Sequence, residues 1–388
     1  MSVYFDWNAT APLRQEARAA MLAAIDVVGN PSSVHAQGRA ARRLIEYARE
    51  QVAGLVGVPP QDVIFTSGGT EANMLALTPG IEAGQRKAPR DHLLVSAIEH
   101  PSVRAGGRFL PESFVEEIPV SAYGQVQLDN LEQRLAELSK AGHRPLISIM
   151  LANNETGVVQ PVAQAAEMIH AAGGLLHVDA IQGPGRISCD FSALKADLLT
   201  ISAHKLGGPK GVGALIKRSD LHIEPQLKGG GQERSQRAGT ENVPGITGFG
   251  SAAAAAMAAF AVESTHMAAM RDRLEAEIKR IHPKAVIFGS EVPRLPNTTL
   301  FAAPGMKAET AVIAFDLEGV AVSSGSACSS GKVAPSHVLA AMGVPPKLAR
   351  GAVRVSLGYS TTESEVSAFL RAWGKLAGAL YKGNEIAA

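Results

Sequence analysis

Lys205 stands where a lysine could act as a nucleophile. The apolar run at residues 196–201 ends in Ser202 and His204, and the glycines and proline that follow Lys205 exclude a regular element there. We therefore expect a buried strand that delivers this lysine to a tight turn. Burial and neighbouring cations lower the pKa of an amine in such a place, and the neutral amine forms a Schiff base with a carbonyl group.

The neighbours of this lysine argue against the ordinary role of a solvated surface charge. Ser202 and His204 offer hydrogen-bond donors for a phosphate, and a second apolar run, 175–178, ends in the acidic Asp179. An aldehyde cofactor with a phosphate and a basic ring nitrogen would use all of these groups. Pyridoxal phosphate is that cofactor.

The composition is that of a globular chain with a sizeable core. Of 388 residues, 46% are apolar and 19% are charged, and the formal net charge is +1. This balance gives no reason to expect a nucleic acid or a membrane as a partner. Two cysteines exclude a disulfide framework and favour a reducing compartment, and the N-terminus lacks the pattern of a signal peptide. A cytoplasmic location is expected.

Polar clusters follow several apolar runs that have the length of strands. The runs are residues 62–66, 92–97, 146–151, 175–178 and 197–201. Helical spacing at Val162–Ala171 separates two of them, which is typical of a parallel sheet with both faces covered. Ligands of such sheets bind beyond the carboxyl ends of the strands. The clusters should therefore meet in one crevice and contribute Thr70, His100, Asn154, Asp179 and Lys205.

The helices and a change of composition predict a division into two domains. Helices are expected at 15–28, at 35–56 with Ser32 and Ser33 as N-caps, and at the Ala-rich stretch Val243–Ile281. We expect a large domain at 14–260. Residues 1–13 with 261–388 would form a smaller α+β domain with strands at 285–288, 297–301 and Val353–Ser356.

The two cysteines lie in opposite surroundings. Cys189 belongs to an apolar stretch and is expected to be a small buried hydrophobe. Cys328 stands among serines and glycines at 323–331, where an exposed, mobile thiolate could form.

The chain as a whole resembles cysteine desulfurases of the NifS/IscS type, a branch of the class V aminotransferases and of the fold-type I pyridoxal-phosphate enzymes. The resemblance rests on motifs at residues 6–10, 30–35, 66–73, 99–101, 153–157, 177–182, 202–213, 229–234, 239–242 and 324–331. Trp7 and Ala203 depart from the family, which usually has Asn and Gly there. Neither position carries a necessary functional group. The resemblance implies a large domain with a mostly parallel seven-stranded sheet.

The resemblance also implies roles for individual residues. Lys205 would be the Schiff-base lysine and a proton carrier, Asp179 the partner of the ring nitrogen, and His100 a stacking acid or base. Arg354 would clamp the substrate carboxylate, against the alternative of a surface charge. Further cofactor contacts are implied for Gly69, Thr70, Asn154, Gln182, Ser202, His204 and, from the other subunit of a homodimer, Thr240.

Cys328 separates the implied activity from transamination. Its thiolate would take the sulfur of L-cysteine, release alanine and hold a persulfide for an acceptor, such as an iron–sulfur scaffold protein. In the family this cysteine also transiently ligates the nascent cluster. An aminotransferase or a cysteine/selenocysteine lyase would share Asp179 and Lys205 without needing the cysteine. A degenerate, non-enzymatic scaffold is the other alternative, and the presence of every motif residue argues against it.

Overall fold

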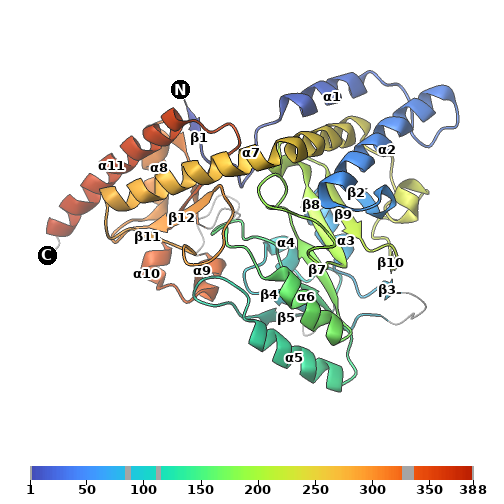
Figure 1. The fold of residues 1–388 in the computed structure, drawn as a ribbon, viewed down its shortest axis with the longest axis horizontal. Helices are drawn as coiled ribbons and strands as arrows, with labels where there is room; N and C mark the ends of the chain where they lie inside the picture. Colours follow the sequence, from blue (N-terminus) through green and yellow to red (C-terminus); the bar gives the residue numbers. More distant parts are fainter. Residues whose placement is uncertain (1, 84–88, 111–114, 326–335, 387–388) are drawn as a thin grey trace.

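The structure, a computed structural model, describes residues 2–83, 89–110, 115–325 and 336–386, with side chains described through residue 380. A seven-stranded sheet forms its centre (Figure 1). In sheet order the strands are β2 (Val63–Thr66), β9 (Gly213–Lys217), β8 (Leu198–Ser202), β7 (Leu175–Asp179), β6 (Pro145–Ser148), β4 (His92–Ser96) and β5 (Val115–Ile118). Only β9 runs against its two neighbours, so the predicted mostly parallel sheet is confirmed.

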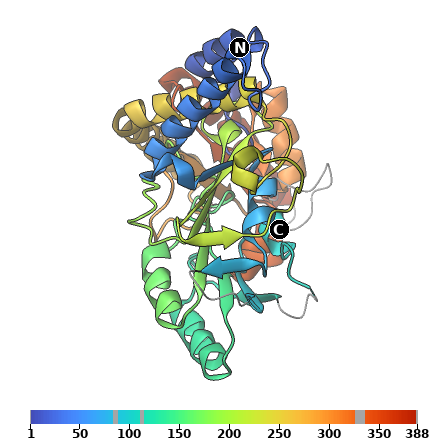
Figure 2. The same ribbon diagram turned by 90° about the vertical axis from the view of Figure 1, so that its right-hand side faces the viewer.

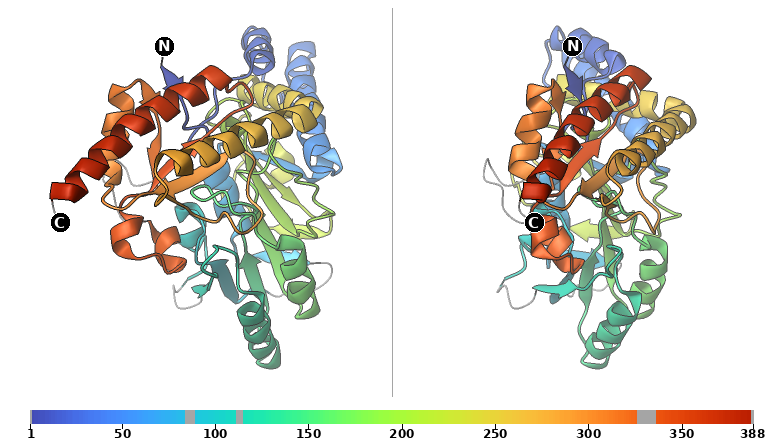
Figure 3. Two further views of the ribbon diagram at one scale, coloured as in Figure 1. Left: turned by 60° about the vertical axis from the view of Figure 1, so that its left-hand side comes forward. Right: turned by 90° about the vertical axis from the view of Figure 1, so that its left-hand side faces the viewer.

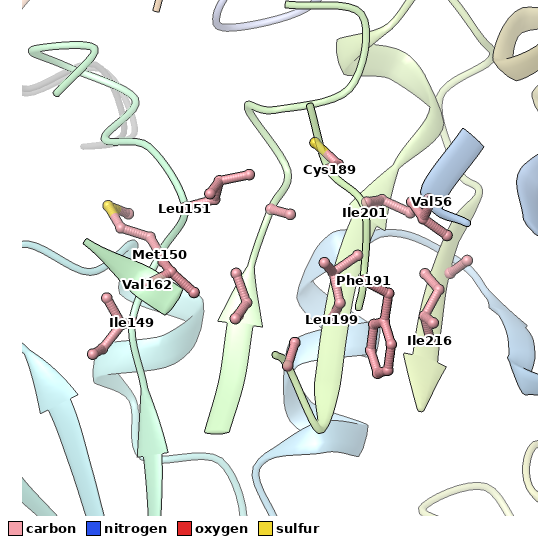
Figure 4. Packing of buried hydrophobic residues seen from close by; sticks show 14 of the residues in the cluster. Val56, Ile149, Met150, Leu151, Val162, Cys189, Phe191, Leu199, Ile201 and Ile216 are labelled. Atoms are coloured by element: carbon pink, nitrogen blue, oxygen red, sulfur yellow. The ribbon is translucent and has the colours of Figure 1, made fainter. Parts of the chain in front are cut away.

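Helices cover both faces of this sheet, which explains why its strands are continuous apolar runs. In β8, Leu199 and Ile201 point into a core shared with α2 (Ala36–Val56) and α6 (Val162–Ala171), part of which Figure 4 shows. Leu198 points to the other face and packs with α3 (Gly69–Ala76). Alternate residues of one strand therefore fill two different cores.

A four-stranded antiparallel sheet lies beside the first. Its order is β11 (Val286–Ile287), β12 (Thr298–Ala302), β15 (Val353–Ser356) and β14 (Ser323–Ser324). It packs with α8 (Ala308–Leu317) and α11 (Glu363–Ile386) in a separate core, where Phe315 stacks on Phe369 at 5.0 Å between ring centroids. The first strand, β1 (Val3–Tyr4), joins this part of the fold by pairing with β13 (Val320–Ala321).

The 39-residue helix α7 (Val243–Ile281) runs alongside both sheets (Figures 1 and 3). Its first half packs Ala252 and Ala256 into the large core, and its second half packs Leu274 and Ile278 into the smaller one. By length and composition alone α7 could cross a membrane, and 44% of its most apolar stretch is buried inside the protein. Burial in two cores is the pattern of a core helix. The domain division at residue 260 stays a prediction.

The predicted N-caps of the second helix are wrong. His35 caps α2, because its Nδ1 accepts a hydrogen bond from the backbone N of Gly38 at 3.2 Å. The serines instead belong to a turn in which the Asn30 side chain accepts from the backbone N of Ser32 at 2.9 Å. An Asn that organises its own turn competes with the capping role that the serines could otherwise take.

Candidate active site

A cavity of about 290 Å³ lies beyond the carboxyl ends of the parallel strands. The predicted site residues that line it are Gly69, Thr70, His100, Asn154, Asp179, Gln182, Ser202, His204, Lys205 and Arg354. Asp179 ends β7, Ser202 ends β8, and His100 follows β4 within a few residues. The parallel arrangement is thus what gathers side chains that are far apart in the sequence.

Two predicted residues are not in this group. Thr240 is exposed and does not line the cavity, and its role toward a second subunit stays a prediction. Cys328, predicted to be the mobile thiolate and a transient iron–sulfur ligand, lies outside the described residues.

Lys205 is held at the cavity by the N-terminal segment of the chain. It ends a short 3-10 turn, Ala203–Lys205, directly after β8. Its Nζ donates to the backbone oxygens of Asn8 at 2.6 Å and Ala9 at 2.8 Å. Both acceptors are backbone carbonyl oxygens, and they hold the end of this side chain at the cavity.

The Asp179 carboxylate is oriented by two donors. Its Oδ1 accepts from the backbone N of Ile181 at 3.0 Å, and its Oδ2 accepts from the Asn73 amide at 2.9 Å. No salt bridge joins it to a lysine or arginine in the described parts of the chain. The nearby carboxyl of Glu99 is fully buried, and burial raises its pKa well above the usual range. The negative charge of Asp179 raises the pKa of Glu99 further.

His100 stands opposite as a neutral imidazole. Burial lowers its pKa from 6.5, and Lys205 lowers it further, whereas Asp179 acts in the opposite direction. Its Nδ1 accepts from the backbone N of Ser102 at 3.2 Å and lies 2.8 Å from the Ser102 hydroxyl, and this hydroxyl accepts from the Asn73 amide at 2.9 Å. Ser102 and Asn73 therefore connect His100 to Asp179 and fix both side chains.

The N-terminus of α3 forms one end of the cavity and has the character of an anion site. Gly69 has no room for a side chain, because an added Cβ would come within 2.3 Å of Ile181. Helix N-termini present free N–H groups and a partial positive charge. Beside them lies His204, whose pKa burial lowers to about 4, with Lys205 and Lys210 as further causes. His204 is therefore neutral at pH 7, and it can donate one hydrogen bond.

Arg354 is buried, with 1% of its side chain exposed, which excludes the alternative of a surface charge. Its guanidinium pairs with Asp6 Oδ1 at 2.7 Å and donates to the backbone oxygen of Asn154 at 2.9 Å. Its Nε is buried and has no hydrogen-bond partner within the described chain. The guanidinium group is thus held in place by two protein oxygens, and its Nε can still donate a hydrogen bond to a ligand.

Sequence reasoning assigned no role to several residues that build this site. The Asn8 amide links the Asn154 backbone to Thr298, and the backbone oxygen of Asn8 accepts from Gln182 Nε2 at 3.0 Å. The other end of the Gln182 amide accepts from Arg186. Asn8 and Asn73 both lie inside the motifs named above, so membership of a motif could have pointed to them. Arg186 lies outside these motifs, and no feature of the sequence pointed to it.

The prediction for Cys189 is confirmed. It is buried, and burial raises the pKa of its thiol to about 12. This thiol therefore stays protonated at neutral pH and is unreactive.

Comparison with known proteins assigns the family. A model of the family described as aminotransferase class-V matches residues 3–369. A cysteine desulfurase of Cereibacter sphaeroides is 41% identical over 95% of this chain and 94% of its own length. The cysteine desulfurase IscS of Dictyoglomus turgidum is 40% identical over 94% of this chain and 92% of its own.

A solved structure has the same architecture. The NifS-like protein from Rickettsia africae superposes with a TM-score of 0.87 at 35% identity, over 98% of this chain and 100% of its own. A solved structure titled SspA in complex with cysteine has a TM-score of 0.75 at 28% identity, over 93% of this chain and 100% of its own. From the family match and these full-length relatives, the chain belongs to the class V aminotransferase family.

Proposed function

We propose that this chain is a cysteine desulfurase that uses pyridoxal phosphate to convert L-cysteine to L-alanine. The observation that carries the proposal is the single cavity in which Lys205, Asp179, His100 and Arg354 meet. Relatives named cysteine desulfurase, about 40% identical over nearly the full length, support it.

The residues around the cavity fit pyridoxal phosphate. The phosphate would be held at the N-terminus of α3 by Gly69 and Thr70, with Ser202 and His204 beside them. Asp179, a buried carboxylate without a described lysine or arginine partner, suits a protonated ring nitrogen. Gln182 and Asn154 would contact the ring oxygen. When bound, the cofactor supplies an electron sink that stabilises negative charge on the substrate carbon.

The protein's own groups would carry the protons and fix the substrate. Arg354 holds the carboxylate of L-cysteine in a bidentate fork, which sets the orientation of the reacting carbon. Lys205 takes and returns protons at that carbon through its Nζ. His100, which lines the same cavity and has a lowered pKa, would lie against the ring and would accept or donate a proton at its second ring nitrogen. Arg354 is buried, whereas Lys205 and His100 are partly exposed at the cavity.

Cys328 would take the sulfur. Its thiolate attacks the sulfur of the substrate, the carbon–sulfur bond breaks, and a sulfur–sulfur bond forms on Cys328. The electron pair and a proton remain with the carbon product, which leaves as alanine. The persulfide would then pass to a sulfur-acceptor protein, such as an iron–sulfur scaffold. This part rests on the resemblance, because Cys328 lies outside the described residues.

A homodimer with shared sites is part of the same proposal. Thr240 lies on the surface after the Gly-rich loop at 229–231, away from the cavity of its own chain. Exposure of a motif residue is what a contact with the neighbouring subunit's phosphate site requires. A cytoplasmic location remains proposed from the sequence.

The product of L-cysteine tests the function. The purified protein should form alanine from L-cysteine in the absence of any keto acid, and Cys328→Ser should bind L-cysteine with an unchanged shift of cofactor absorbance but form no persulfide. A requirement for a keto acid would identify an aminotransferase instead. Alanine formation by Cys328→Ser at the wild-type rate would remove this cysteine from the reaction.

A further inference from the structure

A second cavity, of about 280 Å³, lies at the opposite edge of the same sheet. Its charged or titratable lining residues are all basic among the described positions: Arg90, Arg144, His170 and Arg218. The rest of the lining is small or apolar, with backbone from the segment 173–175 that enters β7. No acidic residue of the described chain lines this second cavity.

The topology explains why the basic side chains meet there. Arg90 precedes β4 and Arg144 precedes β6, and both strands start at this edge. Arg218 follows β9, which runs in the opposite direction and therefore ends where the others begin. The antiparallel pair formed by β3 (Ile81–Ala83) and β10 (Leu221–Ile223) lies near this edge of the sheet and is visible in Figure 2.

Arg90 is buried here with an unsatisfied donor. Only 7% of the residue is exposed, and its Nη1 donates to the backbone oxygen of Gly173 at 3.1 Å. Its Nε is buried and has no partner in the part of the chain that is described. Burial lowers the pKa of Arg90, and the positive charge of Arg144 lowers it further. A buried guanidinium with an open donor is costly unless something anionic faces it.

The carboxylates of this region are already committed to other groups. Asp197 accepts from Arg218 and from His170 Nε2, the latter at 2.9 Å. Asp91 accepts from the backbone N of Arg144 at 2.8 Å, not from its guanidinium. No salt bridge to Arg90 or Arg144 occurs within the described ranges. Asp197 and Asp91 act on Arg90 only from beyond ion-pair distance, and the guanidinium of Arg144 donates to the backbone oxygen of Pro89. Two guanidinium groups therefore line the cavity without a direct ion pair to a carboxylate of the described chain.

We propose that this cavity binds a small tetrahedral oxyanion of the phosphate class, held by Arg90 and Arg144. Guanidinium groups match the geometry of such an anion through paired N–H donors. The volume admits a phosphate, either free or as the phosphoryl group of a small metabolite. The site is separate from the phosphate-binding end of the first cavity, since the two cavities share no lining residue.

Calorimetric titration of the holoenzyme with inorganic phosphate, at constant ionic strength, tests the proposal. The holoenzyme is freed of excess pyridoxal phosphate beforehand, so that the bound cofactor keeps the first cavity filled and no free cofactor competes at the second. Wild type should bind phosphate saturably, and Arg90→Gln and Arg144→Gln should each weaken binding at least about tenfold, since hydrogen bonds to charged groups contribute that much. Arg280→Gln, which removes an exposed arginine on α7, is the matched control and should bind as wild type does.

The titrations distinguish free phosphate from a phosphorylated metabolite as the ligand, and they can also refute the site. Tighter binding of AMP than of phosphate, lost in Arg144→Gln, would identify a phosphorylated metabolite, whereas equal affinities would identify the free anion. Absence of saturable binding in wild type overturns the proposal, as does equal binding by wild type and both cavity variants. If Arg90→Gln fails to fold, Arg144→Gln decides alone. Neither variant should change the rate of alanine formation, which keeps this test independent of the proposed function.

Discussion

Two buried aspartates on neighbouring strands show how the two edges of the sheet differ. Asp197, just before β8, is surrounded by Arg218, His170 and the backbone N of Leu176. Asp179, at the far end of β7, accepts only from an amide side chain and a backbone N–H in the bonds that the structure describes. A carboxylate neutralised within the protein contributes to stability. A carboxylate that is held only by neutral donors can still pair with a positively charged ligand. This difference distinguishes the edge of the sheet that carries the candidate active site.

The largest effect is expected for Lys205→Ala. A positioned acid–base group alone contributes about 10²–10⁴-fold to a rate, and this lysine would also bind the cofactor covalently. Alanine formation from L-cysteine, assayed with saturating pyridoxal phosphate, should fall at least about 100-fold. Retention of more than about one hundredth of the wild-type rate would contradict the assignment.

The two aspartates can be compared directly by isosteric substitution. Asp179→Asn should weaken pyridoxal phosphate binding at least about thirtyfold, because losing one partner of a buried charge pair costs about 2–5 kcal/mol. Absorbance titration with the cofactor measures this, and the unfolding midpoint should change little.

Asp197→Asn should do the reverse. It removes the buried carboxylate that pairs with Arg218, which is 41% exposed and keeps its ion pair with Asp220. The free energy of unfolding should therefore fall by about 1–2 kcal/mol, measured by urea denaturation. The folded protein should bind cofactor as wild type does. If both variants lost cofactor affinity equally, the distinction between the two edges would be wrong.

A smaller effect is expected for Arg354→Lys, which keeps the charge but removes the planar fork. KM for L-cysteine should rise about tenfold to a hundredfold, the equivalent of one charged hydrogen bond. Arg294→Lys is the matched control, because the Arg294 side chain, only 7% exposed, also forms an ion pair, with Glu275 at 2.7 Å, but does not line the cavity. An unchanged KM in Arg354→Lys would return this arginine to a structural role.

The last prediction concerns the pH dependence of stability and Glu155, which lies near Arg354. Burial raises the pKa of Glu155 from 4.5 to about 7, and its carboxyl accepts from the Ser336 hydroxyl. Between pH 4.5 and about 7, Glu155 holds a proton in the folded chain but has released it in the unfolded chain. The free energy of unfolding therefore decreases as the pH rises through this range. Glu155→Gln should flatten this dependence by up to about 3 kcal/mol between pH 4.5 and 8, measured by urea denaturation. An unchanged slope would show that Glu155 is not protonated at neutral pH in the folded chain.

The sequence predicted most of the carboxyl edge, because each polar cluster follows an apolar run and parallel strands end together. Lys205, Asp179 and Arg354 all reach the cavity. The supporting contacts could not be predicted in the same way. Asn8 reaches its partners over 146 or more positions of the chain, through backbone and side-chain atoms that no local pattern encodes.

The amino edge escaped prediction altogether. Arg90, Arg144 and Arg218 each stand next to a strand end, where an exposed charge is the ordinary expectation. Their convergence depends on the order of the strands and on the reversed direction of β9, neither of which follows from spacing. The strand β5 and helix α5 (Leu128–Lys140) were also not predicted, although α5 has apolar residues at helical spacing.

The fate of the sulfur tests the central claim most directly, because the chain has only two cysteines and they are expected to behave oppositely. After a single turnover with L-cysteine, peptide mass spectrometry under non-reducing conditions should find one added sulfur atom on the peptide with Cys328, in amounts equal to the alanine formed. Buried Cys189, with a pKa of about 12, should be unmodified. Alanine without added sulfur on Cys328, or sulfur on Cys189 instead, would contradict the account.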